Sequence, residues 1–113
     1  MAVTFESALS RFLSECAHVT NVHDLTTKWR IELEGGYFLD LFFNATFGKY
    51  SYTLSQGERR ILGWDNAPHH QKLANSPHHF HREDGSVVSS NLNGDPDHDL
   101  EIVRVEIEEF LAR

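Results

Sequence analysis

The chain has 113 residues, a single cysteine and a net charge of −7 at pH 7, with 40% hydrophobic and 12% aromatic residues. This size is typical of one domain whose core needs no disulfide, so we expect a single domain over residues 1–113 in a reducing, cytoplasmic compartment. The acidic balance disfavours nonspecific nucleic-acid binding, and the sequence has neither an apolar run long enough to span a membrane nor an N-terminal signal-peptide pattern.

The first predicted element is a helix over residues 4–18, where apolar residues recur every three or four positions. Thr4 is suited to cap its N-terminus, because its hydroxyl can accept from a free backbone N–H of the first turn. Cys16 falls on the apolar stripe, so we expect a buried structural thiol rather than a nucleophile. The short stretch at residues 21–24 is expected to be a connection.

Strands with short connections follow the helix. Apolar and polar residues alternate along the chain, and glycine-containing turns separate the runs. Sequential strands joined this way form an antiparallel meander most readily. The predicted strands are residues 28–34, 37–44, 49–54 and 59–64, with two further short strands at residues 77–81 and 86–90.

The Gly35-Gly36 turn constrains the pairing of the first two of these strands. A loop one residue longer than the glycine pair sets Ile31 opposite Leu39 or Leu41 and keeps one apolar face. Phe38 and Phe42 then fall on the other face. We therefore expect a central strand that is either covered on both sides or part of a homodimer contact.

The last predicted element is a helix that begins at Asp95-Pro96, with proline at its first position and acidic residues in its first turn. Its apolar stripe runs to Leu111. Together the elements predict an α+β fold, in which N- and C-terminal helices pack on one face of an antiparallel meander sheet of four to six strands.

Histidine is concentrated between residues 64 and 81, where five of the eight histidines lie and two Pro-His-His steps occur. Imidazole is the side chain whose ordinary pKa lets it change charge near neutral pH, so this stretch is the candidate site. If residues 77–81 are extended, His79 and His81 point to one face and His78 and Phe80 to the other. The candidate catalytic residues are Asp65, His69, His70, His79 and His81.

Acid–base catalysis at a phosphodiester is one chemistry that fits these residues. An imidazole can take a proton from a ribose hydroxyl or give one to a leaving oxygen, and Asp65 can orient it. Cationic side chains on the neighbouring strands can hold a phosphate. The candidate substrate-binding residues are Lys49, Tyr50, Arg59 and Arg60. Together they predict a ribonuclease site that needs no metal and no cofactor.

Two other interpretations remain open. Neutral imidazoles bind zinc, nickel and copper, but the spacing matches no standard zinc motif, and adjacent histidines on a strand point to opposite faces. At most one member of each pair can then join a common metal site. Alternatively, Asp65, Asn66 and Pro68 simply form a turn, and the histidines hold backbone carbonyls.

The motifs themselves resemble one protein family. Trp64-Asp-Asn-Ala-Pro-His-His70, followed by Ser76-Pro-His-His-Phe-His81, is similar to the TumE-like toxin family of bacterial and archaeal toxin–antitoxin modules, and the similarity runs from about Trp29 to the C-terminus. The resemblance implies a small toxin, suspected to be ribonuclease-like, that a helix-turn-helix antitoxin neutralises by direct binding. We therefore expect a toxin acting on RNA through the histidine stretch. The alternative is a non-enzymatic interaction or metal-binding domain.

Overall fold

A seven-stranded antiparallel sheet with two helices forms the fold in the computed structural model, which describes residues 4–113. The strands pair in chain order, so the sheet is a meander, as the sequence predicted, with more strands than the four to six expected. The elements are α1 (Phe5–Glu15), β1 (Val19–Asp24), β2 (Trp29–Leu33), the 3-10 turn η1 (Glu34–Gly36), β3 (Tyr37–Asn44), β4 (Lys49–Gln56), β5 (Arg59–Asp65), β6 (His79–His81), β7 (Val87–Ser89) and α2 (Pro96–Leu111).

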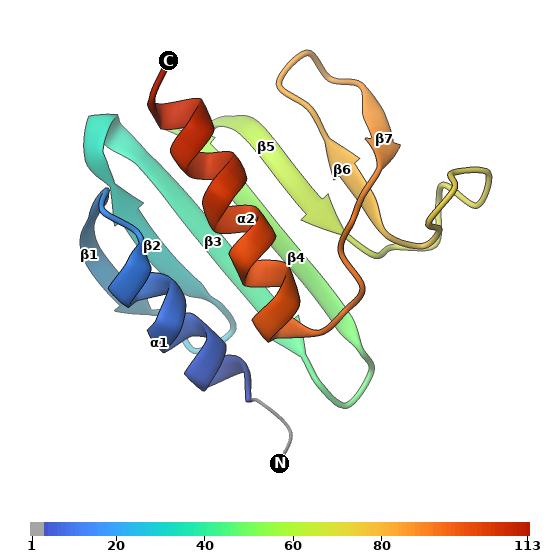
Figure 1. Ribbon diagram of the computed structural model, residues 1–113, viewed down its shortest axis with the longest axis horizontal. Helices are drawn as coiled ribbons and strands as arrows, with labels where there is room; N and C mark the ends of the chain where they lie inside the picture. Colours follow the sequence, from blue (N-terminus) through green and yellow to red (C-terminus); the bar gives the residue numbers. More distant parts are fainter. Residues whose placement is uncertain (1–3) are drawn as a thin grey trace.

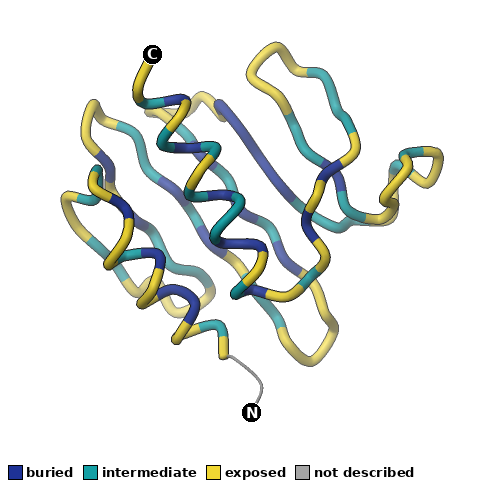
Figure 2. Tube along the Cα trace, viewed as in Figure 1, coloured by how far each residue is buried: buried dark blue, intermediate teal, exposed yellow. Residues whose placement is uncertain are grey.

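Both helices lie on the same face of the sheet, with α2 crossing its middle and α1 beside it (Figure 1). Thr4 caps α1 by accepting a hydrogen bond from the Ser7 N–H at 3.1 Å, and Asp95 caps α2 by accepting from the Asp97 N–H at 3.1 Å. The buried positions face each other between helices and sheet (Figure 2), and Cys16 is among them, as predicted. Within residues 4–113, no helix combines the length and the apolar character that crossing a membrane would take.

The strand that the sequence prediction missed is β1, whose residues 21–24 were expected to be a connection. It pairs along β2, with Val22 opposite Ile31 and His23 opposite Arg30. Asn21 and Asp24 have low strand propensity, and only Val19 and Val22 give it an apolar side. Pairing with β2 at the sheet edge stabilises this strand, and that contribution cannot be read from local sequence.

The predicted register between β2 and β3 is confirmed, because Ile31 lies opposite Leu39. The connection is the three-residue turn η1, in which Gly35 and Gly36 adopt φ values of 83° and 79°, a region that favours glycine. The strand is central in the sheet, but helices cover only one of its faces, so the expected cover on both sides is wrong. Phe42 stays 36% exposed on the open face, and the homodimer contact there stays an expectation.

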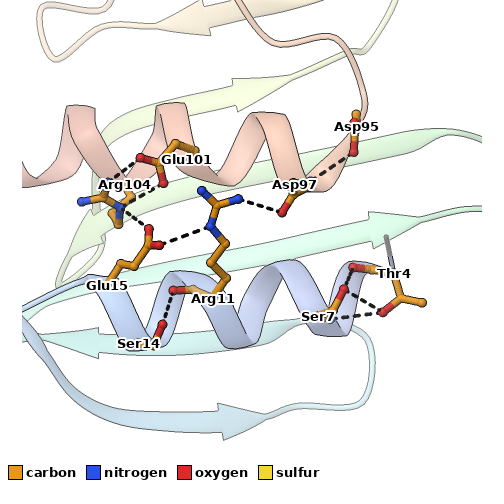
Figure 3. A network of polar contacts seen from close by, with 9 residues as sticks. All are labelled: Thr4, Ser7, Arg11, Ser14, Glu15, Asp95, Asp97, Glu101 and Arg104. Carbon is orange, nitrogen blue, oxygen red and sulfur yellow. Dashed lines mark hydrogen bonds and ion pairs between the residues drawn. The ribbon is translucent and has the colours of Figure 1, made fainter. Parts of the chain in front are cut away.

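Charged side chains connect the two helices along their outer surface (Figure 3). Arg11 of α1 lies 3.2 Å from Asp97 of α2, and Arg104 of α2 lies 3.4 Å from Glu15 of α1. Glu101 also pairs with Arg104. Such ion pairs at the surface contribute little individually, so this network helps to align the helices while the buried apolar contacts stabilise them.

Acid is expected to weaken the fold through Asp40 of β3. Lys28 Nζ and Arg30 Nε donate hydrogen bonds to its carboxylate, each at 2.8 Å. Burial alone would raise the pKa of Asp40, but the bonds from Arg30 and Lys28 outweigh burial and hold that pKa below its ordinary value. The stabilisation is therefore complete above the unfolded-state pKa of about 4 and is lost as the pH falls through the folded-state pKa.

Urea unfolding at pH 7 and pH 3 tests this expectation. Wild type should lose about 1 kcal/mol more than Asp40→Asn, which has no carboxylate to protonate at this position. Equal losses in the two proteins would assign the acid sensitivity to other carboxylates.

Candidate functional site

His79 and His81 of the second motif project from the open face of the sheet, opposite the helices. Asp65 of β5 lies across from His79 of β6, and Trp64 lies across from Phe80. The Trp64 and Phe80 rings stack with their centroids 5.0 Å apart on the helix side. Because strand side chains alternate, His79 and His81 share the other face with Asp65. The predicted division of faces is therefore confirmed.

His78 takes the opposite direction and is half-buried against the core. Its Nδ1 lies 2.7 Å from the hydroxyl of Tyr50, which is buried. Burial first, and then the negative charges of Asp99 and Asp65, raise the pKa of Tyr50 far above its ordinary value, so the phenol keeps its proton. Tyr50 thus supports His78 from inside the fold, and the substrate-binding role expected from the sequence stays a prediction.

Asp65 is at the centre of the polar contacts on the open face. Its Oδ1 lies 2.7 Å from His79 Nε2, and its Oδ2 lies 3.1 Å from His81 Nε2. On the other side of the His79 ring, Nδ1 lies 3.0 Å from the carbonyl oxygen of Pro77. A carbonyl only accepts hydrogen bonds, so Nδ1 carries a proton. The second ring nitrogen of His79, Nε2, is then the one that lies against the Asp65 carboxylate.

His70 completes the group from the loop between β5 and β6. Its ring meets His79 edge-on with centroids 4.6 Å apart, and the His81 centroid lies 6.4 Å away. We call Asp65, His70, His79 and His81 the histidine cluster. One histidine of each Pro-His-His pair, His70 and His79, therefore joins it, which is the maximum that strand geometry was expected to allow.

Arg60 lies at the outer side of the cluster, with Nη2 3.4 Å from His81 Nδ1. Burial first, and then the charge of Arg60, lower the pKa of His81, although the bond to Asp65 acts in the opposite direction. His81 is therefore neutral at neutral pH and has a lone pair to offer, and its side chain is 15% exposed.

Two hollows flank the first histidine pair, each with a volume of about 410 Å³. One includes Lys49, Asp65 and His69 in its lining, and the other includes His69 and His70. His69 is exposed and lies at the rim of both, outside the cluster. Lys49 thus lines the same hollow as Asp65, and its role in holding a phosphate stays a prediction.

Arg59, the third of the predicted phosphate-binding cations, pairs with Glu83 rather than with the histidine cluster. It is exposed, and its guanidinium lies 4.0 Å from the carboxylate of Glu83. Arg60 and Lys49 therefore remain the candidates for holding a phosphate beside the cluster.

Side-chain amides fix the loop that holds His70, which extends beyond the sheet edge in Figure 1. Asn66 accepts a hydrogen bond from the Tyr50 N–H at 3.1 Å, which ties the start of the loop to β4. Asn75 donates to the carbonyls of Ser90 and Leu92 at 2.7 and 2.9 Å. Sequence reasoning missed Asn75, since a single amide in a polar segment has no periodicity that singles it out.

The comparisons with known proteins agree with the motif resemblance. The family model described as Toxin TumE matches residues 6–111, which include nearly all of both helices and every strand. Among the curated proteins and the solved structures, none matches the chain.

Proposed function

This chain belongs to the TumE toxin family, and we propose that it acts on RNA at the histidine cluster. Membership makes it the toxin component of a toxin–antitoxin module, with an antitoxin as partner. The observation that supports an RNA-directed activity is the convergence of three imidazoles and a carboxylate beside Arg60 on the open face of the sheet.

The proposed reaction is cleavage of the RNA backbone by its own 2′-hydroxyl. A base removes the hydroxyl proton, the 2′-oxygen bonds to phosphorus, and the bond from phosphorus to the 5′-oxygen breaks. An acid gives that oxygen a proton, which leaves a 2′,3′-cyclic phosphate and a 5′-hydroxyl. His70 and His69 are the imidazoles that can reach such a substrate, because His79 is buried. Proton transfer of this kind typically contributes about 10²–10⁴-fold.

Charge supports the division of the surface between RNA and antitoxin. Arg60 and Lys49 give the open face local positive charge beside the cluster, where a phosphate oxygen would be held. The helix face carries the acidic residues of α2, and a basic helix-turn-helix antitoxin would be attracted to it. We place both partners, and a homodimer through Phe42 if one forms, in the cytoplasm.

Expression in growing cells without antitoxin tests the activity. Wild type is expected to stop growth and deplete bulk RNA, whereas His70→Ala should lower the cleavage rate by about 10²-fold or more, because it removes an accessible proton-transfer group. The matched control is His23→Ala on β1, an exposed imidazole paired with Glu32 far from the cluster, which should behave as wild type.

Growth and RNA that stay intact under wild-type expression would overturn the proposal, as would undiminished cleavage by His70→Ala. Growth arrest with intact RNA would instead favour a toxin that acts by binding, which is the non-enzymatic alternative.

A further inference from the structure

The inner part of the histidine cluster has the donor set of a metal centre. We propose that Asp65, His79 and His81 together bind one divalent first-row transition-metal ion. This inference uses the same site as the proposed function but depends only on the positions of three side chains. Each offers one ligand atom, and these atoms lie within 4.8 Å of one another.

The spacing matches a coordination shell. With metal–ligand bonds of about 2.0–2.2 Å, neighbouring ligand atoms of one ion lie about 3–3.5 Å apart. The two measured separations from Asp65 oxygens to the imidazole Nε2 atoms, 2.7 and 3.1 Å, fall at or just below that range. An ion between these atoms requires only small side-chain shifts.

The orientation of His79 matches that of a metal ligand. Its Nδ1 proton is committed to the Pro77 carbonyl at 3.0 Å, which leaves Nε2, 2.7 Å from the Asp65 carboxylate, as the nitrogen free to bind a metal ion. Metal-binding histidines usually donate their second ring N–H to a carbonyl or carboxylate in this way, and the bond fixes the tautomer. A cation between His79 and Asp65 offsets the repulsion that a lone pair and a carboxylate oxygen would otherwise have at 2.7 Å.

Accessibility increases from one ligand to the next. The His79 side chain is 3% exposed, that of His81 15% and that of Asp65 23%, so the outer coordination positions face solvent and the ring of His70. A ligand set of two imidazoles and one carboxylate suits zinc, manganese, iron or nickel better than magnesium or calcium. An ion bound at His81 Nε2 moves the ring proton to Nδ1, so the exposed Arg60 side chain would turn outward.

Metal titration without RNA tests the site. Protein purified without a metal-affinity column is stripped with a chelator and titrated with Co²⁺, whose visible bands report coordination, and with Zn²⁺ by calorimetry. Wild type should bind one equivalent, and Asp65→Asn and His81→Asn should each weaken binding by at least 10–100-fold. The control His69→Asn changes an exposed histidine outside the cluster and should bind metal as wild type does. Excess Zn²⁺ should raise the melting temperature of wild type and His69→Asn but not that of Asp65→Asn or His81→Asn.

Uptake of less than one equivalent by wild type would overturn the site, as would equal binding by all four proteins, which marks adventitious binding to surface histidines. Circular dichroism and urea midpoints establish whether each variant is folded. If Asp65→Asn is unfolded, the metal binding of His81→Asn tests the site. Stoichiometric binding in a protein that leaves RNA intact would keep the metal site and reject the ribonuclease. RNA cleavage by protein that takes up no ion would reject the metal site and keep the ribonuclease, with imidazole acid–base catalysis as its mechanism.

Discussion

Asp65→Asn is expected to lower RNA cleavage by about 10²–10⁴-fold while the protein stays folded. The carboxylate contacts both His79 and His81, so we expect its charge to stabilise a proton or a metal ion among the imidazoles. An asparagine amide has the same shape, and its NH₂ group can donate to His79 Nε2 while its oxygen accepts from His81. The substitution therefore keeps a side chain of the same shape beside both imidazoles and removes the charge, together with the hydrogen bond that Oδ1 accepts from the Ala67 N–H at 3.0 Å.

Growth inhibition and RNA cleavage by purified protein measure the expected loss of activity. Thermal unfolding measures whether the variant stays folded. A matched control is Asp84→Asn, which neutralises an exposed carboxylate in the turn between β6 and β7 and should leave cleavage unchanged. Cleavage by Asp65→Asn at the wild-type rate would show that the charge of Asp65 has no part in the activity. Loss of the fold in this variant would instead assign Asp65 a structural role.

The fold was predictable from sequence where periodicity carried the information. Requiring one apolar face predicted Ile31 opposite Leu39 or Leu41, and the structure has Leu39. The helix start at Asp95-Pro96 followed from capping chemistry. The strand β1 was not predictable, because its stability comes from hydrogen bonds to β2 rather than from its own polar residues. Local patterns thus identified the elements with strong amphipathic character and missed the weakly apolar edge.

The site was predictable to the extent that strand alternation determines direction. That rule separates His79 and His81 from His78 on the sequence alone, and the contact of His78 with Tyr50 shows the separation. It says nothing about loops, so it could not distinguish His70, which packs on His79, from His69, which does not join the cluster. Burial of Tyr50 likewise depends on α2 covering the sheet, which a single strand pattern does not reveal.

A second aspartate has a structural role that its sequence context did not indicate. Asp99 of α2 is 0% exposed, and its two carboxylate oxygens accept hydrogen bonds from the backbone N–H groups of Asn93 and Gly94 at 2.9 and 2.8 Å. His98 Nδ1 lies 2.8 Å from the same carboxylate. Asp99 therefore fixes the loop that leads from β7 into α2, whose Leu92 is fully buried.

Asp99→Ala is expected to lower the free energy of unfolding by about 3 kcal/mol, because it leaves two backbone donors without their charged acceptor at a buried position. For a domain of this size the melting temperature should fall by about 10 °C. Urea and thermal unfolding of the purified protein measure both quantities.

Asp97→Ala, two residues earlier in the same helix turn, is the matched control. Its carboxylate is 34% exposed and meets Arg11 at 3.2 Å, so its loss should cost under about 1 kcal/mol, most of it from the helix dipole and a screened ion pair. The two variants make the same chemical change, so the difference in their free energy of unfolding reflects the burial of the carboxylate and the number of backbone donors left unpaired. Equal destabilisation by the two variants would mean that the Asn93–Gly94 loop is held by the packing of Leu92 and not by the buried carboxylate.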